Sequence, residues 1–388
     1  RGKHWHNMIS TLVAKYVQSF GKARVVSRAS AVRAVSAEKP APFTIMNCLT
    51  HTAGLPYGTD FNQKPYSPET KSCYELVQSV ESGKVRSLAH FVDELAKLPL
   101  RAQPGSYWHY SWGIDVLGRV VEVISGLPLG QFLQKELFAP LGMRDTAFSV
   151  PRDKASRLAA VYCNRESAQL MGVRAGSLPR GKEALCRIDG ARPEESRWMA
   201  GRCCPVESGG GIMGANMGGL VSTLNDCARF FGMLLGRGEF GGTRILRAQT
   251  VEQFCFTDLL PACLNSGKQQ RAWGAPLGWT ALGEIGLPRG SRDATSDVKY
   301  NDFEPGEVGY GGAACTFWAL NPARDTAILW FTQSLDNEPF IHDDESIYVA
   351  SRAVLPRCVM RTSSKRRSAE QPHPRKRRRT TGSEGTAG

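Results

Sequence analysis

Long apolar runs and a Walker loop are both missing from this sequence. No apolar stretch approaches the ~18 residues that a membrane-spanning helix needs. Residues 1–10 include basic side chains but no apolar segment follows them, so we expect no signal peptide. There is no Walker loop, no internal repeat and no coiled-coil heptad, which argues against P-loop nucleotide-binding folds and repeat folds. The first residue is Arg1 and not Met, so we expect that the chain is not a complete translation product.

The eleven cysteines lack the spacing of a metal site. No C-x-x-C pair occurs, Cys203 and Cys204 are adjacent, and the seven histidines do not gather around them. A zinc site needs clustered ligands at a recognisable spacing. We therefore predict no metal, no cofactor and free thiols in a reducing compartment, which favours an intracellular protein, cytoplasmic or nuclear.

Positive charge is concentrated at the end of the chain. The net charge is +13, and residues 361–388 hold nine Lys or Arg against Glu370 and Glu384. This segment has no aromatic residue, so we expect residues 359–388 to be a disordered basic tail. Its two basic clusters, within 365–379, resemble a bipartite signal for the nuclear import machinery, and a merely solvated basic tail is the alternative. Without interleaved aromatic residues, sequence-specific nucleic-acid binding is not expected.

The remaining sequence has the composition of a globular protein, 41% hydrophobic and 22% charged. Apolar spacing and capping residues predict helices over 44–55, 88–98, 112–125 and 128–138, one that begins after Thr223, and one over 346–355. The segments 56–74 and 150–215 are rich in polar residues and glycine and are predicted to be irregular.

The last third of the chain is rich in strand-forming residues. Strands are predicted over 277–283, 312–320 and 326–333, with a turn over 321–325. Helices first and an antiparallel sheet last predict an α+β fold. We divide the chain into a helical, loop-rich portion over 1–220, a sheet portion with flanking helices over 221–358, and the tail.

Two stretches carry a specific resemblance, L49-T-H-T-A-G-L55 and P104-G-S-Y-W-H-Y-S111. They resemble the serine β-lactamase and penicillin-binding protein superfamily, and most closely its class C-like esterase branch. L137-F-A-P-L-G-M143, the glycine-rich stretch 209–219 and V308-G-Y-G-G-A-A314 follow in the same order. The resemblance implies a β-lactamase-like fold and hydrolysis of small esters or amides through an acyl-enzyme.

In that family a Ser attacks a carbonyl, a Lys one helical turn later activates it, and a Tyr transfers the proton. The resemblance places Tyr110 in the role of this Tyr and Ser111 beside it as a proton relay. A free phenol has a pKa of about 10, so Tyr110 needs adjacent positive charge to act as a base. Many members have Asn where this chain has Trp112, which removes an amide that could contact substrate. The alternative is a Tyr110 that is simply buried beneath the helix over 112–125.

The family's third element is a strand with Lys or His followed by Thr-Gly, and here it is matched by Tyr310-Gly311-Gly312. Esterase-like members use an aromatic-Gly-Gly triplet, so this departure favours ester over β-lactam chemistry. The two glycines let a substrate carbonyl approach the backbone, and by resemblance the Ala313 N–H is an oxyanion donor. The alternative is a glycine-permissive bulge at the start of a strand.

None of the three Ser-x-x-Lys matches fits the nucleophile. Ser19–Lys22 contains a Gly, and Ser296–Lys299 lies in the wrong chain order. Ser36–Lys39 is followed by Pro40 and Pro42, which prevent the long helix that the family places there. Cys315 has no flanking base to activate it as a substitute.

The family expects its nucleophile upstream of Thr11. We therefore predict that this chain lacks both the nucleophile and the initial strands, and that it is inactive alone. Three hypotheses follow: a fragment of an active serine esterase, a non-catalytic binding or scaffold protein on the same fold, and a nuclear interaction protein that works through its tail.

Overall fold

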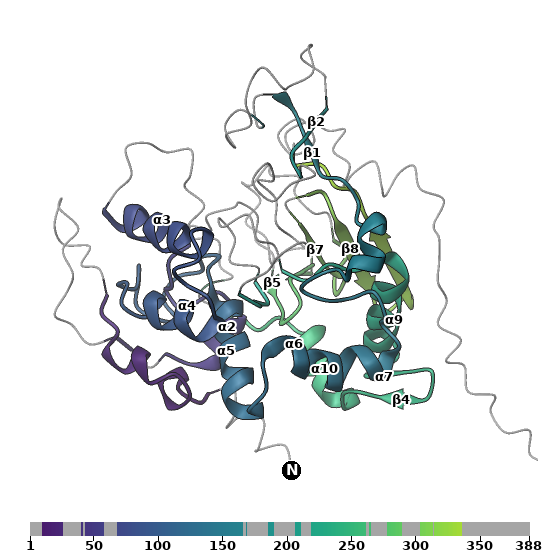
Figure 1. The fold of residues 1–388 in the computed structure, drawn as a ribbon. Helices are drawn as coiled ribbons and strands as arrows, with labels where there is room; N and C mark the ends of the chain where they lie inside the picture. The colour runs from purple at the N-terminus through teal and green to yellow at the C-terminus, as the bar shows by residue number, and fades with distance from the viewer. Residues whose placement is uncertain are drawn as a thin grey trace, which may run out of the picture.

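Figure 1 shows the computed structural model of the protein, which describes residues 10–25, 40–41, 43–57, 68–165, 168, 185–189, 206–210, 219–260, 264, 278–288, 303–312 and 314–335. Several predictions lie outside the described residues: the tail over 359–388 with its clusters within 365–379, the helix over 346–355, the pairs Ser36–Lys39 and Ser296–Lys299, Ala313, and residues 211–218 of the glycine-rich stretch.

The first part of the described chain is mainly helical. In chain order its helical elements are the 3-10 helices η1 (Val13–Lys15) and η2 (Gln18–Lys22), the helices α2 (Ile45–Leu49), α3 (Pro68–Glu81), α4 (Leu88–Leu95), α5 (Gly113–Ser125) and α6 (Leu129–Leu133), the π-helix η3 (Gln134–Phe138), α7 (Ala139–Leu141) and the 3-10 helix η4 (Arg152–Arg157). Thr44 caps α2 by accepting the Asn47 N–H, and Gly126 ends α5 in the left-handed conformation, so both predicted helix boundaries are confirmed.

Three expectations about these helices need correction. The helix predicted over 44–55 ends at Leu49, because His51 and Gly54 adopt positive φ and turn the chain. The helix predicted to stop before Pro140 runs through it to Leu141, because the widened turn of η3 precedes the proline ring. Helix α3 occupies 68–74, part of the segment that was predicted to be irregular.

The later part of the described chain holds the main sheet. Its elements are the strands β1 (Tyr162–Cys163) and β2 (Cys186–Arg187), the helix α9 (Leu224–Leu235), the strands β3 (Glu239–Phe240) and β4 (Thr243–Arg244), the helix α10 (Ala248–Cys255), and the strands β5 (Gly278–Trp279), β6 (Glu284–Ile285), β7 (Val308–Gly311), β8 (Phe317–Asn321) and β9 (Thr326–Trp330). β5 to β9 form one sheet in chain order, each strand antiparallel to the next. The predicted α+β class is confirmed.

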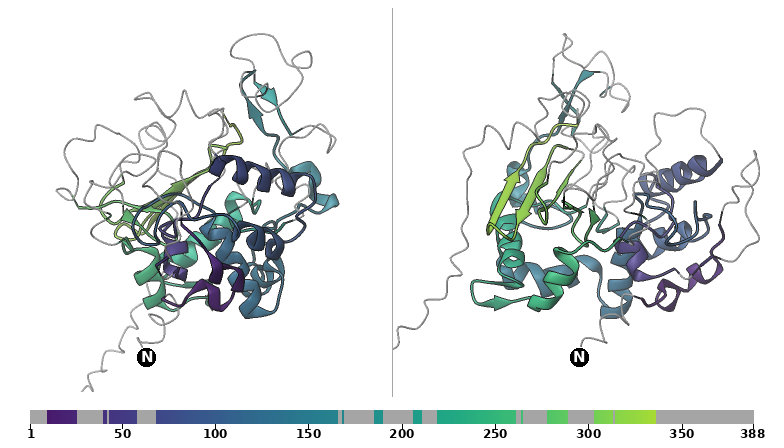
Figure 2. Two further views of the ribbon diagram at one scale, coloured as in Figure 1. Left: turned by 90° about the vertical axis from the view of Figure 1, so that its left-hand side faces the viewer. Right: turned by 180° about the vertical axis from the view of Figure 1, so that it is seen from behind.

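Two large apolar clusters divide the described chain into a helical body and a sheet body. The helical body packs α2 to α5 around side chains such as Phe91 and Trp112. The sheet body packs Phe138, Phe231 and Leu320 together, from η3, α9 and β8. Figure 1 and the view from behind in Figure 2 show α3 to α5 on one side and the main sheet on the other.

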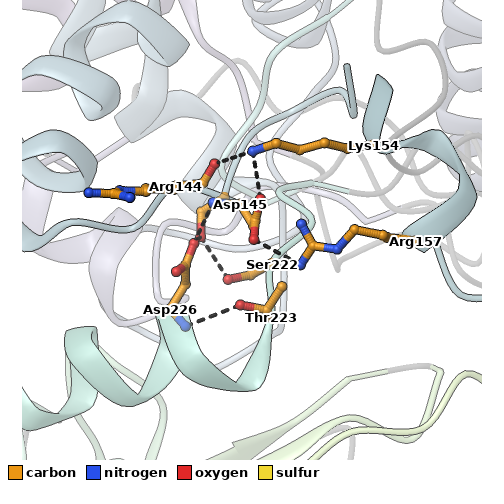
Figure 3. Close-up of polar contacts among 8 residues, drawn as sticks. Arg144, Asp145, Lys154, Arg157, Ser222, Thr223 and Asp226 are labelled. Atoms are coloured by element: carbon orange, nitrogen blue, oxygen red, sulfur yellow. Dashed lines mark hydrogen bonds and ion pairs between the residues drawn. The ribbon is translucent and has the colours of Figure 1, made fainter. Parts of the chain in front are cut away.

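A buried carboxylate anchors α9 to the chain that follows α7 (Figure 3). Asp226 accepts hydrogen bonds from the Asp145 N–H at 2.7 Å and the Thr146 hydroxyl at 2.9 Å. Its own N–H donates to Thr223, which caps α9 as the sequence predicts. Lys154 and Arg157 pair with the outer Asp145 at 2.7 and 2.8 Å. The buried Asp226 therefore has the donors that a desolvated carboxylate requires.

No single helix in the described ranges is both long enough and apolar enough to cross a membrane; only the bent pair 113–125 and 129–141 meets the criteria of length and composition.

Candidate active site

A group of aromatic rings lies where the helical body meets the sheet body. Trp108, Leu260 and Trp279 form a buried cluster, and Tyr110 and Tyr310 pack against it. Trp108 and Tyr110 belong to the segment that leads into α5, Trp279 to β5 and Tyr310 to β7. The motifs over 104–111 and 308–314 therefore meet in space. The Trp279 indole N–H also donates to the Leu49 carbonyl across this boundary, at 3.1 Å.

The segment that carries Tyr110 is held against the turn after α2 by backbone hydrogen bonds. The His109 N–H donates to the His51 carbonyl at 3.0 Å, and the Arg101 N–H donates to the Gly54 carbonyl at 2.7 Å. Gly54 has φ +73°, and a Cβ there would lie 2.2 Å from the Ala102 carbonyl oxygen. Only glycine both adopts this positive φ easily and has no Cβ to clash. This explains why L49-T-H-T-A-G-L55 has Gly at position 54.

His51 is the residue that orients Ser111. Its Nδ1 accepts the Ser111 backbone N–H at 3.2 Å and lies 3.4 Å from the Ser111 hydroxyl. Burial, and secondly the neighbouring His109, lower the pKa of His51 to about 3, so the ring is neutral at physiological pH. A neutral ring with so low a pKa is a poor base, and its Nδ1 is already occupied as an acceptor. The pair His51 and Ser111 is therefore an orienting contact and not a Ser–His nucleophile.

Tyr110 lies between His51 and Tyr310. Its ring centroid is 4.3 Å from that of His51 and 6.1 Å from that of Tyr310, to which it is nearly parallel at 15°. Burial raises the pKa of Tyr110, a hydrogen bond with Tyr310 acts in the opposite direction, and the buried Asp115 raises it further. None of these groups is a cation, so Tyr110 is a neutral phenol in the described site.

Asp115 brings the glycine-rich stretch to the same site. It is buried in the first turn of α5 and accepts a hydrogen bond from the Ser208 hydroxyl. A Cβ on Gly210 would lie 2.4 Å from an Asp115 carboxylate oxygen, so this part of the stretch packs directly on the start of the helix. The described end of the glycine-rich stretch therefore packs on the first turn of α5, which follows the segment that carries Tyr110.

Tyr310 and its glycines lie at the end of β7. Tyr310 is opposite Trp318 and Gly311 opposite Phe317, so the triplet starts within a regular ladder. Burial raises the pKa of Tyr310, and its neighbour Tyr110 raises it further. The Gly312 N–H donates to the Thr316 carbonyl at 2.7 Å, closing a turn, so this N–H is already engaged. The Ala313 N–H falls outside the described residues, and its oxyanion role stays a prediction.

Two aromatic residues of the site were not identified from the sequence. Tyr57 meets Tyr110 edge-on at 5.0 Å, and Trp279 meets His51 edge-on at 5.2 Å. The Tyr57 hydroxyl is buried without a hydrogen-bond partner among the residues that the structure describes. A buried unpaired hydroxyl costs about 1–3 kcal/mol, so it needs a compensating reason. Their only signal in the sequence is their aromatic character: Tyr57 falls in a segment predicted to be irregular and Trp279 in a predicted strand.

Trp112, which stands where many family members have Asn, belongs to the core of the helical body. It is fully buried, with its ring 5.6 Å from Phe91 and 5.9 Å from Tyr57. The substitution therefore places an apolar ring in the core and removes the Asn amide as a contact for substrate.

The described Ser-x-x-Lys pair lies elsewhere. The Ser19 hydroxyl donates to Asp93 at 2.9 Å, and Ser19 and Lys22 line an exposed cleft on the outside of α4. The hydroxyl nearest to Tyr110 along the chain is that of Ser111, which contacts His51. Within the described ranges, no group of three or more His, Cys, Asp or Glu is arranged to hold a metal ion.

Comparison with known proteins identifies the family of this chain. The family model described as Beta-lactamase matches residues 9–351. Protein Rv1367c from Mycobacterium tuberculosis is 29% identical over 324 residues, covering 82% of this chain and 70% of that protein. Esterase EstB from Burkholderia gladioli is 33% identical over 198 residues, covering 48% of each.

Among solved structures, the unliganded simvastatin synthase LovD from Aspergillus terreus, in its selenomethionyl form, matches with a TM-score of 0.58 at 20% identity. The match covers 84% of this chain and 72% of that one. At this level of sequence identity, the structural similarity supports a common fold and nothing more.

Proposed function

The chain belongs to the beta-lactamase family, and on this premise we propose that it carries the proton-transfer half of a serine hydrolase site. The proposed reaction is hydrolysis of a small ester or amide through an acyl-enzyme. One observation supports this most: Tyr110 and Tyr310, from two motifs 200 positions apart in the chain, stack on each other and share a hydrogen bond. Both rings keep part of their surface exposed, so a substrate can reach them.

The electrostatics of Tyr110 indicate what the site still requires. Burial and Asp115 hold the pKa of this phenol above its usual value, so it does not accept a proton readily near pH 7. A cation within hydrogen-bonding range would stabilise the phenolate and so lower the pKa of Tyr110. A Lys one helical turn after the nucleophilic Ser would supply this charge. Among the residues that the structure describes, no such pair lies beside Tyr110. We therefore propose that the 388-residue chain does not turn over esters by itself.

The lining favours esters that carry no negative charge near the reacting bond. The partly exposed Tyr110 and Tyr310 present aromatic surface, and His51 is neutral. The family position that often holds Lys or His is Tyr310 here, so the cation that would pair with a substrate carboxylate is replaced by a phenol. An apolar acyl group packs well on such rings.

The test compares the purified 388-residue chain with a product extended upstream by whatever its coding sequence encodes. Both are assayed with a chromogenic p-nitrophenyl acyl ester and a fluorophosphonate label. We expect neither turnover nor labelling for the 388-residue chain, and both for an extended chain that adds a Ser-x-x-Lys helix. Tyr110→Phe in that extended chain should lower kcat by about 100-fold or more, the usual range for a general base.

Tyr107→Phe is the matched control, because Tyr107 is in the same segment but stacks on His109, outside the ring cluster. Turnover by the 388-residue chain would refute the missing nucleophile. Inactivity of both chains would refute the hydrolase proposal and favour a non-catalytic binding protein on the same fold.

A further inference from the structure

Two buried cysteines face each other in the small sheet formed by β1 and β2. The strands are antiparallel, and their register pairs Tyr162 with Arg187 and Cys163 with Cys186. Both cysteines are fully buried, in a satellite cluster separate from the two main bodies. Figure 1 shows this two-stranded sheet beyond the end of the main sheet. Neither cysteine belongs to the Tyr110 site.

The hydrogen bonds around the pair define its geometry. The Ile188 N–H donates to the Val161 carbonyl at 2.9 Å, which makes that facing pair a hydrogen-bonded one. Tyr162 turns its own N–H and carbonyl to the other side, toward Gln333 and Leu335. Because hydrogen-bonded and non-hydrogen-bonded pairs alternate along an antiparallel ladder, Cys163 and Cys186 form the next hydrogen-bonded pair.

This geometry suits a disulfide. Facing residues in a hydrogen-bonded pair have Cα atoms about 5.5 Å apart, and disulfides most often join Cα atoms about 5.5–6 Å apart. The side chains also leave the same face of the sheet, because they are register partners. In a hydrogen-bonded pair the Cβ atoms lie toward the wide end of the range of about 4.5–5.5 Å. They must come within about 3.5–4.5 Å, so the strands move closer together when the bond forms.

We propose that Cys163 and Cys186 are an oxidation site that forms a reversible intramolecular disulfide with a small-molecule disulfide, such as oxidised glutathione, as the oxidant. One thiol loses its proton, and its thiolate attacks the glutathione disulfide, releasing one glutathione thiolate and leaving a mixed disulfide. The second cysteine, as a thiolate, then displaces the other glutathione. Two protein thiols and one glutathione disulfide give one protein disulfide and two glutathione thiols.

The place of the pair in the fold gives the bond a consequence. The cross-link closes the 22 residues between the two cysteines into a loop, and constraining the unfolded chain in this way stabilises the folded one. The satellite cluster is small, and small cores gain most from such a link. β1 also bridges to Ser334, just after the edge strand β9, so the bond would hold that contact in place as well.

The experiment refolds the full 388-residue chain in a mixture of reduced and oxidised glutathione, alkylates the remaining thiols and digests with trypsin. Cys163 falls in the peptide over 158–165 and Cys186 in the peptide over 183–187, each without a second cysteine. We expect most of Cys163 in a linked peptide two hydrogen atoms lighter than the sum of the two, which separates on reduction. Refolding in the buffer gives the reagent access to thiols that are buried in the folded protein.

Cys163→Ser and Cys186→Ser should each reduce this linked peptide to background. Cys227→Ser is the matched control, because its thiol is only partly buried and lies on α9, and it should leave the link unchanged. Recovery of both peptides separately alkylated after refolding would overturn the proposal. So would a linkage of Cys163 or Cys186 mainly to other cysteines.

Discussion

The helical body and the sheet body contribute to the site in different ways. The helical body fixes Tyr110 through backbone hydrogen bonds and a left-handed turn at His51 and Gly54. The sheet body presents Tyr310 from a regular antiparallel ladder. One tyrosine is therefore positioned by a turn that only a few residues can form, and the other by a strand that many sequences would form. The site should be more sensitive to mutation on the helical side.

Replacing Gly54 by Ala is the strongest test of this difference. The new methyl group would lie 2.2 Å from the Ala102 carbonyl oxygen, at a backbone conformation that L-residues adopt with difficulty. We expect the free energy of unfolding to fall by more than about 3 kcal/mol. Urea denaturation followed by tryptophan fluorescence measures this. Gly241 also has a positive φ but has open space around it, so Gly241→Ala should lower the free energy of unfolding much less. Equal losses of stability in the two variants would show that the clash with Ala102 is not destabilising.

Removing Asp226 tests the sheet side. Asp226→Ala leaves the Asp145 N–H and the buried Thr146 hydroxyl without their acceptor, and we expect a loss of about 2–3 kcal/mol. Asp226→Asn keeps an acceptor oxygen and should lose less.

Glu252→Ala is the control for Asp226→Ala, because Glu252 makes an exposed ion pair with Arg237 and its loss should be within about 1 kcal/mol. The exchange rate of the Ser111 amide hydrogen should not change in the Asp226 variants if the two bodies are positioned independently. Faster exchange there would contradict the comparison.

The pH dependence of stability reports on His51. Its pKa falls from 6.5 in the unfolded chain to about 3 in the folded one, so between these values the unfolded chain binds the extra proton. The contribution of His51 is therefore complete above pH 6.5 and is lost as the pH falls toward 3, by up to about 1.4 kcal/mol per pH unit.

Urea midpoints at pH 7 and pH 5 measure this loss. His51→Asn is the matched variant, because Asn tolerates positive φ and offers an oxygen to the Ser111 N–H, but does not titrate. We expect a smaller difference between the two pH values in this variant. The same slope in both proteins would show that His51 is not the group responsible.

The smallest effect is expected at Tyr57. Tyr57→Phe removes a buried hydroxyl that has no partner in the described part of the chain and keeps the ring that meets Tyr110. We expect unfolding stability to stay the same or rise by up to about 1 kcal/mol. Thermal unfolding measures it. A clear loss of stability would mean that the hydroxyl makes an interaction that stabilises the fold.

The local structure could be predicted where capping residues mark helix ends. Thr44, Gly126 and Thr223 each begin or end a helix where the sequence places them, because a side-chain acceptor or a left-handed glycine acts within a few residues. The motifs also predicted that Tyr110 and Tyr310 belong to one site, and the structure brings their rings together. Helix α3 was missed because proline and polar residues dominate its first turn. The run through Pro140 was missed because a π-turn has no simple sequence signal.

The sequence by itself determined the α+β class, most helix starts, the family and the two motifs that carry Tyr110 and Tyr310, because these depend on short-range spacing and on residue chemistry. Only the tertiary structure decided that His51 is buried, neutral and directed at Ser111, that Trp112 packs into the core, and that Cys163 faces Cys186. Burial and register depend on which distant segments meet, and the spacing of residues along one segment does not specify that.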